Sequence, residues 1–136
     1  MTIEGWSHIA ISVPNTDAAV EWYGRVLGFP VAHSDSIASP DGHTFKITWM
    51  QGPDFSLELF EVPGSAPLPR ERLDPDTDIK TLGNKFLSLG VEDIEKAREK
   101  LKNMGVEMLP SSTKGISGLF TRDNTGNLIE LCERHA

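Results

Sequence analysis

Apolar and polar residues alternate near the start of the chain, over residues 5–13. Ile9, Ile11 and Val13 share one side of an extended segment there, and His8 lies on the other side with small residues. Alternation with a period of two is typical of a β-strand with one buried face. We therefore expect a strand that presents His8 on the face opposite its apolar side chains.

A helical period replaces the alternation after residue 14. Asn15 or Thr16 can cap the start of a helix, and Gly28 can end it in the left-handed conformation. The residues after Gly28 return to a strand-like pattern, interrupted by Pro-Asp-Gly and Gly-Pro-Asp turns. Strands are predicted at about 29–36, 44–51 and 55–62. The first part of the chain thus has the predicted order βαβββ.

The same order recurs after residue 80. A strand at 84–91 and a helix at about 93–104 are followed by three predicted strands, at 106–109, 116–122 and 127–133. The chain is therefore predicted to be one α+β domain over residues 1–136, built from two βαβββ modules. Module one covers 1–63 and module two covers 83–136. Residues 64–82, rich in proline and charge, are expected to be a linker without regular structure.

Overlaying the two modules identifies a set of candidate site positions. His8 falls on Phe86, and Glu58 falls on Glu130. Both glutamates lie on the strand face opposite their leucine neighbours. A carboxylate on an inward face costs several kcal/mol of desolvation unless it is paired, hydrogen-bonded or bound to a metal. Glu58 and Glu130 are accordingly candidate site residues, together with His8. The alternative is a structural ion pair with an arginine or lysine.

Other polar residues receive simpler interpretations. Glu61 falls out of phase with Glu58 and is expected to face solvent at a sheet edge. His33 and His43 lie in or next to predicted turns and are expected at the surface. Cys132 shares the strand face of Glu130, but no nearby residue would activate it, so we expect a buried, unreactive thiol.

Charge and composition exclude several classes of partner. The formal net charge is −7, and lysine and arginine form no cluster, so neither a nucleic acid nor an anionic membrane surface is an expected partner. No apolar run is long enough to span a bilayer. The N-terminal residues lack a basic region followed by an apolar one, and the chain has a single cysteine. These features indicate a cytoplasmic protein.

Four segments together resemble a known superfamily. They are the His-Ile-Ala-Ile-Ser-Val strand at 8–13, the Trp-Tyr-Gly-Arg-Val-Leu-Gly-Phe helix exit at 22–29, the Leu-Glu-Leu-Phe-Glu strand at 57–61 and the hairpin at 122–131. In order and spacing they resemble the vicinal oxygen chelate superfamily, which includes glyoxalase I, extradiol dioxygenases, methylmalonyl-CoA epimerase and the fosfomycin and bleomycin resistance proteins. The resemblance implies a glyoxalase-like fold whose two modules curl around a central cavity.

The resemblance also implies a metal site, a small-molecule substrate and a homodimer. The positions of His8, Glu58, Phe86 and Glu130 would hold one divalent ion. Phe86 departs from the pattern, because metal-binding relatives commonly carry a second histidine there and a phenyl ring cannot ligate. One histidine and two carboxylates remain a workable set for one divalent ion, Mn, Fe, Zn, Ni or Mg.

Three functional hypotheses follow. The first is a lyase or isomerase in which a divalent ion chelates two adjacent substrate oxygens and a glutamate moves a proton. Dioxygenase chemistry is less favoured, because the resemblance ties it to two histidines. The second is a metal-free binding or antibiotic-resistance protein, with Phe86, Phe60 and Trp49 lining a ligand pocket. The third is a metal-free isomerase that uses Glu58 and Glu130 as an acid and base pair.

Overall fold

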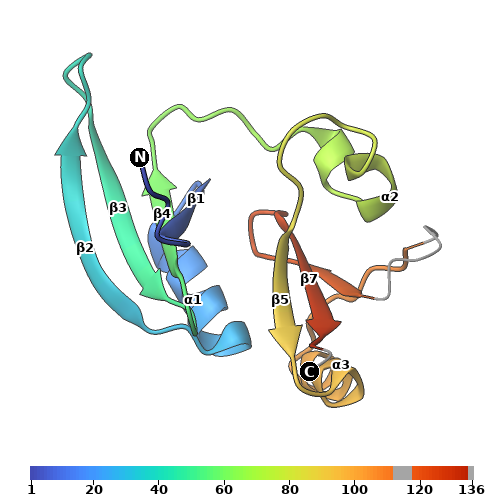
Figure 1. The fold of residues 1–136 in the computed structure, drawn as a ribbon. Helices are drawn as coiled ribbons and strands as arrows, with labels where there is room; N and C mark the ends of the chain where they lie inside the picture. The colour runs from blue at the N-terminus through green and yellow to red at the C-terminus, as the bar shows by residue number, and fades with distance from the viewer. Residues whose placement is uncertain (112–117, 135–136) are drawn as a thin grey trace. The chain divides into compact units, whose positions relative to one another are not determined.

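The computed structural model describes residues 1–111 and 118–134 of the chain. The backbone forms two compact units, Met1–Ala66 and Pro67–Ala136, each with its own β-sheet (Figure 1). Both sheets carry a helix, so the predicted α+β class is confirmed. In the described part of the chain, no helix has the length and apolar character needed to cross a membrane.

Unit 1 has the predicted order βαβββ. Its elements are β1 (His8–Ser12), α1 (Thr16–Leu27), β2 (Val31–Ala38), β3 (Thr44–Gln51) and β4 (Ser56–Glu61). The strands lie in the order β1-β4-β3-β2, with β1 parallel to β4 and the other neighbours antiparallel (Figure 1). Because β4 lies between β1 and β3, a side chain on β4 has cross-strand neighbours on both sides.

Local sequence signals account for α1. The Asn15 side chain accepts a hydrogen bond of 2.8 Å from the Ala18 amide, and Gly28 ends the helix at φ 77°. Both signals were expected, since asparagine satisfies free amides at an N-cap and glycine adopts positive φ without strain. The helix buries one face against β3 and β4; the buried residues are Thr16, Ala19, Trp22, Tyr23 and Val26.

Glu61 corrects one expectation in unit 1. Its Oε2 accepts two hydrogen bonds of 2.7 Å, one from the Thr16 amide and one from the Thr16 hydroxyl. The carboxylate therefore joins the end of β4 to the first turn of α1 and is not simply a solvent-facing edge charge. These two hydrogen bonds lower the pKa of Glu61 below its ordinary value.

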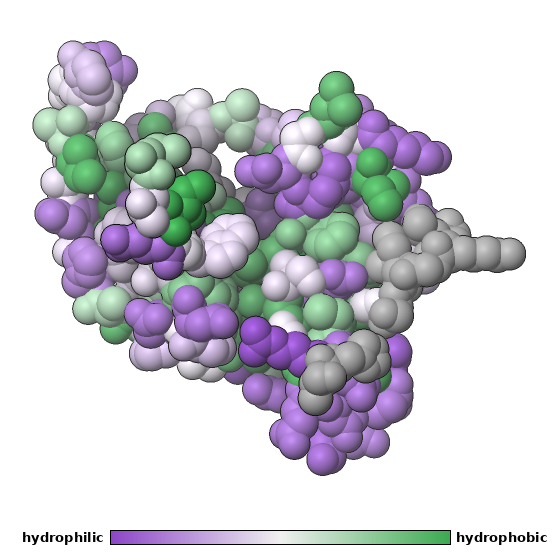
Figure 2. All heavy atoms as spheres, in the orientation of Figure 1, coloured by the Kyte–Doolittle hydropathy of each residue, from purple (hydrophilic) through white to green (hydrophobic). Residues whose placement is uncertain are grey.

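Unit 2 repeats the strand, the helix and the final pair of strands, and its described residues form a three-stranded sheet. Its elements are the 3₁₀ helix η1 (Arg70–Arg72), α2 (Pro75–Asp78), β5 (Leu87–Val91), α3 (Ile94–Asn103), β6 (Leu119–Arg122) and β7 (Leu128–Glu133). The sheet order is β5-β7-β6, with β5 parallel to β7. Leu101 of α3 is buried, whereas the rest of that helix is largely hydrophilic at the surface (Figure 2).

Two predicted strands of module two differ in the structure. The strand expected at 106–109 is reduced to a single bridge between Leu109 and Phe120. The strand expected at 116–122 is observed as Leu119–Arg122, and positions 116 and 117 lie outside the described residues. At this bridge the Leu109 amide donates a hydrogen bond to the Phe120 carbonyl at 2.8 Å, which pairs residue 109 with β6.

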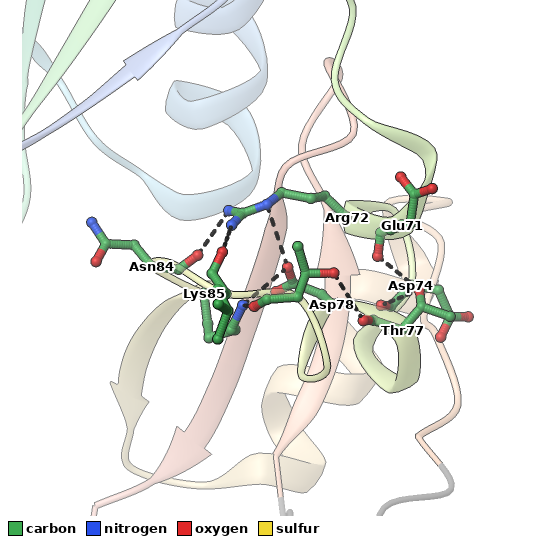
Figure 3. A network of polar contacts seen from close by, with 9 residues as sticks. Glu71, Arg72, Asp74, Thr77, Asp78, Asn84 and Lys85 are labelled. Atoms are coloured by element: carbon green, nitrogen blue, oxygen red, sulfur yellow. Dashed lines mark hydrogen bonds and ion pairs between the residues drawn. The ribbon is translucent and has the colours of Figure 1, made fainter.

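The segment expected to be an irregular linker contains η1 and α2 and belongs to unit 2 from Pro67 onward. Figure 3 shows the polar network that orders it. Arg72 donates to the carbonyls of Asn84 at 2.7 Å and Leu82 at 3.2 Å. Asp78 is 2% exposed, and its Oδ1 lies 3.7 Å from both Arg72 Nε and Lys85 Nζ. The proline and charge content concealed these contacts, which join residues more than five positions apart.

Candidate functional site

Both units hold a glutamate at the same place in the sheet. Glu58 on β4 is the cross-strand partner of Ala10 on β1, and Glu130 on β7 is the cross-strand partner of Ser88 on β5. His8 comes two residues before Ala10 within β1 and so shares the face of Glu58, and Phe86 comes two residues before Ser88, just ahead of β5. The strand pairing thus gives Glu58 and Glu130 equivalent positions in the two sheets.

Glu58 is the buried acidic residue of the unit 1 face. It is 7% exposed, and its cross-strand neighbours are Ala10 on one side and Trp49 on the other. His8 Nε2 lies 3.4 Å from Glu58 Oε2. No lysine or arginine of the described residues forms an ion pair with Glu58, which removes that structural alternative for unit 1.

The second ring nitrogen of His8 is also engaged. His8 Nδ1 lies 3.0 Å from Ser7 Oγ, and the direction of this hydrogen bond depends on the tautomer. When Nδ1 donates to Ser7, the Nε2 lone pair beside Glu58 is free to bind a cation. When Nδ1 accepts, Nε2–H donates toward the carboxylate. Ser7 therefore acts on the candidate site through His8, a role that the sequence pattern did not indicate.

Aromatic side chains lie on the strands that flank the His8–Glu58 pair. Trp49 meets the His8 ring edge-on, with centroids 4.9 Å apart, and His33 stacks on Trp49 at 5.7 Å. His33 is exposed, as expected, but it lies on the strand β2 and stacks on a candidate site residue. Phe60, two residues beyond Glu58 on the same face, contacts Phe45 at 5.9 Å.

Glu130 has a different environment in unit 2. Its Oε2 accepts a hydrogen bond of 2.6 Å from Ser88 Oγ, which also lies 3.5 Å from Cys132 Sγ. Phe86 packs edge-on against Phe120, with centroids 5.0 Å apart, and Phe120 is the cross-strand partner of Glu130. Sequence analysis did not select Ser88, although the strand period places it on the face of Glu130.

The chemistry of the donors decides whether a divalent ion fits. His8 and Glu58 offer an imidazole nitrogen and a carboxylate oxygen from neighbouring strands, a combination that suits Zn, Mn and Fe(II). Glu130 offers a further carboxylate from unit 2, where Phe86 offers no donor. The described residues bring no three histidine, cysteine or acidic side chains close enough to hold a metal.

The chain is similar in sequence to a curated enzyme and to a solved glyoxalase family protein. A curated protein from Cereibacter sphaeroides, named ethylmalonyl-CoA/methylmalonyl-CoA epimerase, is 29% identical over 132 residues, covering 92% of this chain and 94% of its own. A solved glyoxalase family protein from Enterococcus faecalis is 25% identical with a TM-score of 0.72, covering 96% of this chain and 98% of the other.

More distant structures share the fold. Glyoxalase I of Leishmania major has a TM-score of 0.68 at 21% identity, covering 93% of this chain and 84% of its own. The fosfomycin resistance protein FosX of Listeria monocytogenes, solved with Mn(II) and 1S,2S-dihydroxypropylphosphonic acid, has a TM-score of 0.70 at 16% identity, covering 98% and 95%. The glyoxalase-like fold is confirmed. Residues 5–131 match the family model, and the chain therefore belongs to the Glyoxalase/Bleomycin resistance protein/Dioxygenase superfamily.

Proposed function

We propose that this protein is an isomerase that moves a proton on a carbon atom next to a carbonyl group of a small acyl substrate. The observation that carries the proposal is the pair of glutamates, Glu58 and Glu130, at equivalent positions of the two modules. Inverting a carbon centre requires one group that removes a proton and another that returns one on the opposite side. The epimerase from Cereibacter sphaeroides supports this reaction class and makes 2-alkylmalonyl thioesters the first substrates to test.

The residues of the chain have distinct roles in this proposal. A carboxylate oxygen of Glu58 or Glu130 takes the proton from the carbon next to the carbonyl group, and the other glutamate delivers a proton. Burial of Glu58 in the sheet, where Trp49 is its cross-strand neighbour, limits the water that could compete for that oxygen. Trp49, Phe60 and Phe86 supply apolar surface for the alkyl part of the substrate.

We further propose that His8, Glu58 and Glu130 hold one divalent ion. Such an ion, when bound, supplies Lewis-acid polarisation of two adjacent substrate oxygens. His8 remains a pure ligand, oriented through its Nδ1 by Ser7.

A metal-free binding protein is the second candidate. The observation that favours it is Phe86, which fills the position of a second histidine and is held against Phe120. Together with the stacked rings of Trp49 and His33, it would offer flat apolar surface to an aromatic or cationic ligand.

The deciding experiment combines metal content with proton exchange. The protein is purified without chelator or affinity tag, analysed for metal, and incubated in D₂O with methylmalonyl-CoA and ethylmalonyl-CoA while deuterium uptake is followed by NMR. About one metal per chain and catalysed exchange, both lost in His8→Ala, support the proposal. Glu58→Gln and Glu130→Gln should each abolish exchange, whereas Glu133→Gln on the exposed end of β7 should not. A folded protein that binds no metal and exchanges no proton rejects the isomerase in favour of the binder.

The last part of the proposal concerns the oligomeric state and the cellular location of the protein. We propose a homodimer in the cytoplasm that binds neither nucleic acid nor membrane. Sedimentation equilibrium at micromolar concentration measures the assembly directly, and a monomer mass would reject the dimer.

A further inference from the structure

Glu58 and Glu130 occupy equivalent positions but have different neighbours. The cross-strand partner of Glu58 on β1 is Ala10, which has no polar side chain. The cross-strand partner of Glu130 on β5 is Ser88, and its hydroxyl reaches the carboxylate at 2.6 Å. The two glutamates are therefore held differently, although the backbone around them repeats.

The Ser88 hydroxyl donates its hydrogen to Glu130. An ionised carboxylate can only accept, so the single O–H of Ser88 must be the donor in this short, charge-assisted contact. The Cys132 thiol lies 3.5 Å from Ser88 Oγ and also donates toward the Leu89 carbonyl at 3.8 Å.

The opposite side of Glu130 is left open by a glycine. Because β7 is the central strand, Glu130 has β5 on one side and β6 with the preceding Gly118 on the other. A Cβ atom built on Gly118 would lie 2.7 Å from Glu130 Cδ and would also overlap Cγ and Oε1. Carbon atoms do not approach so closely, so any larger residue at 118 would displace the carboxylate.

We propose that Ser88 is a positioning residue that works with Gly118 to fix the carboxylate of Glu130. Ser88 holds Oε2 on the β5 side, and Gly118 leaves the space that Oε1 occupies on the β6 side. Glu130 thus presents one defined oxygen, Oε1, for proton transfer or ligation, whereas Glu58 is oriented by His8. This assignment of roles rests on the proposed isomerase activity, but the placement of Glu130 can be measured without it.

The test compares Ser88→Ala with Ser88→Thr, which keeps the hydroxyl, and with Ala10→Ser, the matched change in unit 1. Crystal structures of the variants give the Glu130 side-chain position, and deuterium exchange into methylmalonyl-CoA gives kcat and KM separately. We expect Ser88→Ala to move Oε2 from its place and to lower kcat about 10- to 100-fold, the usual effect of losing an orienting partner. Ser88→Thr should keep both the position of Oε2 and the kcat of the unmodified protein. Ala10→Ser should leave the position of the Glu130 side chain unchanged.

Two outcomes overturn the positioning role. The first is a Glu130 carboxylate that keeps its position in Ser88→Ala. The second is a loss of kcat that Ser88→Thr does not repair. If the unmodified protein exchanges no proton, the isomerase proposal fails, and the crystallographic comparison alone still decides whether Ser88 fixes Glu130.

Discussion

A single ring, that of Phe86, bears most directly on metal binding. Phe86 stands two residues before the partner of Glu130, as His8 stands two residues before the partner of Glu58. We predict that Phe86→His tightens binding of Zn or Mn roughly tenfold or more, about 1.4 kcal/mol, because it adds an imidazole donor. Isothermal titration of the apo protein measures the change.

The matched control for this prediction is Phe45→His, which places an imidazole on β3 of unit 1, four residues before Trp49, the cross-strand partner of Glu58. Only Phe86→His should tighten the binding. Equal affinity in the unmodified protein and in Phe86→His would contradict the proposed set of ligand positions.

Gly118 provides a second prediction for one residue. Gly118→Ala should displace the Glu130 side chain, because the new Cβ would overlap it. We expect proton exchange to fall about 100-fold, in line with the cost of misplacing a reacting group by about 1 Å, with little change in melting temperature. Gly24→Ala, within α1 where a Cβ would make only an ordinary contact of 3.6 Å with the Phe29 carbonyl, is the comparison for general effects of losing a glycine. An active Gly118→Ala variant would show that the space is dispensable.

For single residues, the sequence predicted which side chains share a sheet face, but not which side chains contact one another. The period of two placed His8, Glu58 and Glu130 correctly on one face each, because that period is a property of the extended backbone. Ser7, Ser88 and His33 were missed as site residues. Their roles depend on rotamers and on register with a distant strand, and neither is encoded in local periodicity.

Among the elements, the junction of α1 with β4 depends on one carboxylate. Glu61 accepts hydrogen bonds from both the amide and the hydroxyl of Thr16. Glu61→Gln should therefore lower the free energy of unfolding by about 1–2 kcal/mol, because the start of the helix loses these charge-assisted contacts. For a domain of this size, that is a fall of about 4–8 °C in melting temperature. Calorimetry at pH 7 checks it. Glu21→Gln on the exposed face of α1 should have a much smaller effect.

The same contact gives a pH dependence. Thr16 lowers the pKa of Glu61 from its ordinary 4.5, so the carboxylate is more acidic in the folded chain than in the unfolded one. Its stabilisation is fully present above the unfolded value and is lost as the pH falls through the lowered folded value. Denaturation between pH 6 and pH 3, compared with Glu61→Gln, should show a steeper loss of stability below about pH 4.5 in the unmodified protein. Parallel curves would contradict this.

Element boundaries could be predicted wherever the chain carries its own stop signals. Asn15 and Gly28 delimit α1, and the Asp123 side chain, which accepts the amides of Thr125, Gly126 and Asn127, delimits the turn before β7. The segment before β6 lacked such signals. Among its described residues, the bridge from Leu109 to Phe120 and the hydrogen bond from the Thr121 hydroxyl to the Glu107 carbonyl show that it lies against β6.

For the whole molecule, the repeat predicted two modules, and the structure divides the chain between Ala66 and Pro67. What the sequence could not predict is that residues 67–82 fold with unit 2. Arg122 Nε donates to the Leu73 carbonyl at 2.6 Å, and Arg72 reaches the backbone at Asn84. Both contacts cross from one element to another, and the proline-rich composition of the segment is equally typical of a free linker.

Asp78 makes the importance of this segment testable. It is almost fully buried, it is paired with Arg72 and Lys85, and its Oδ1 accepts no hydrogen bond from the described residues (Figure 3). Asp78→Ala leaves two cations without their shared anion and should destabilise the protein by about 2–3 kcal/mol, less than a fully buried pair because both cations are about a quarter exposed. Urea denaturation measures the loss.

Hydrogen exchange then locates the effect of Asp78→Ala. Protection should fall for the amides that this network holds in order, those of Leu73, Ile79 and Thr81, each of which donates to a carbonyl within residues 70–78. Glu71→Gln, an exposed change in the same segment, should leave both stability and protection within about 0.5 kcal/mol of the unmodified protein. If Asp78→Ala behaved like Glu71→Gln, the network would be incidental, and the order of the segment would have to come from the packing of Leu73 against Gly126 instead.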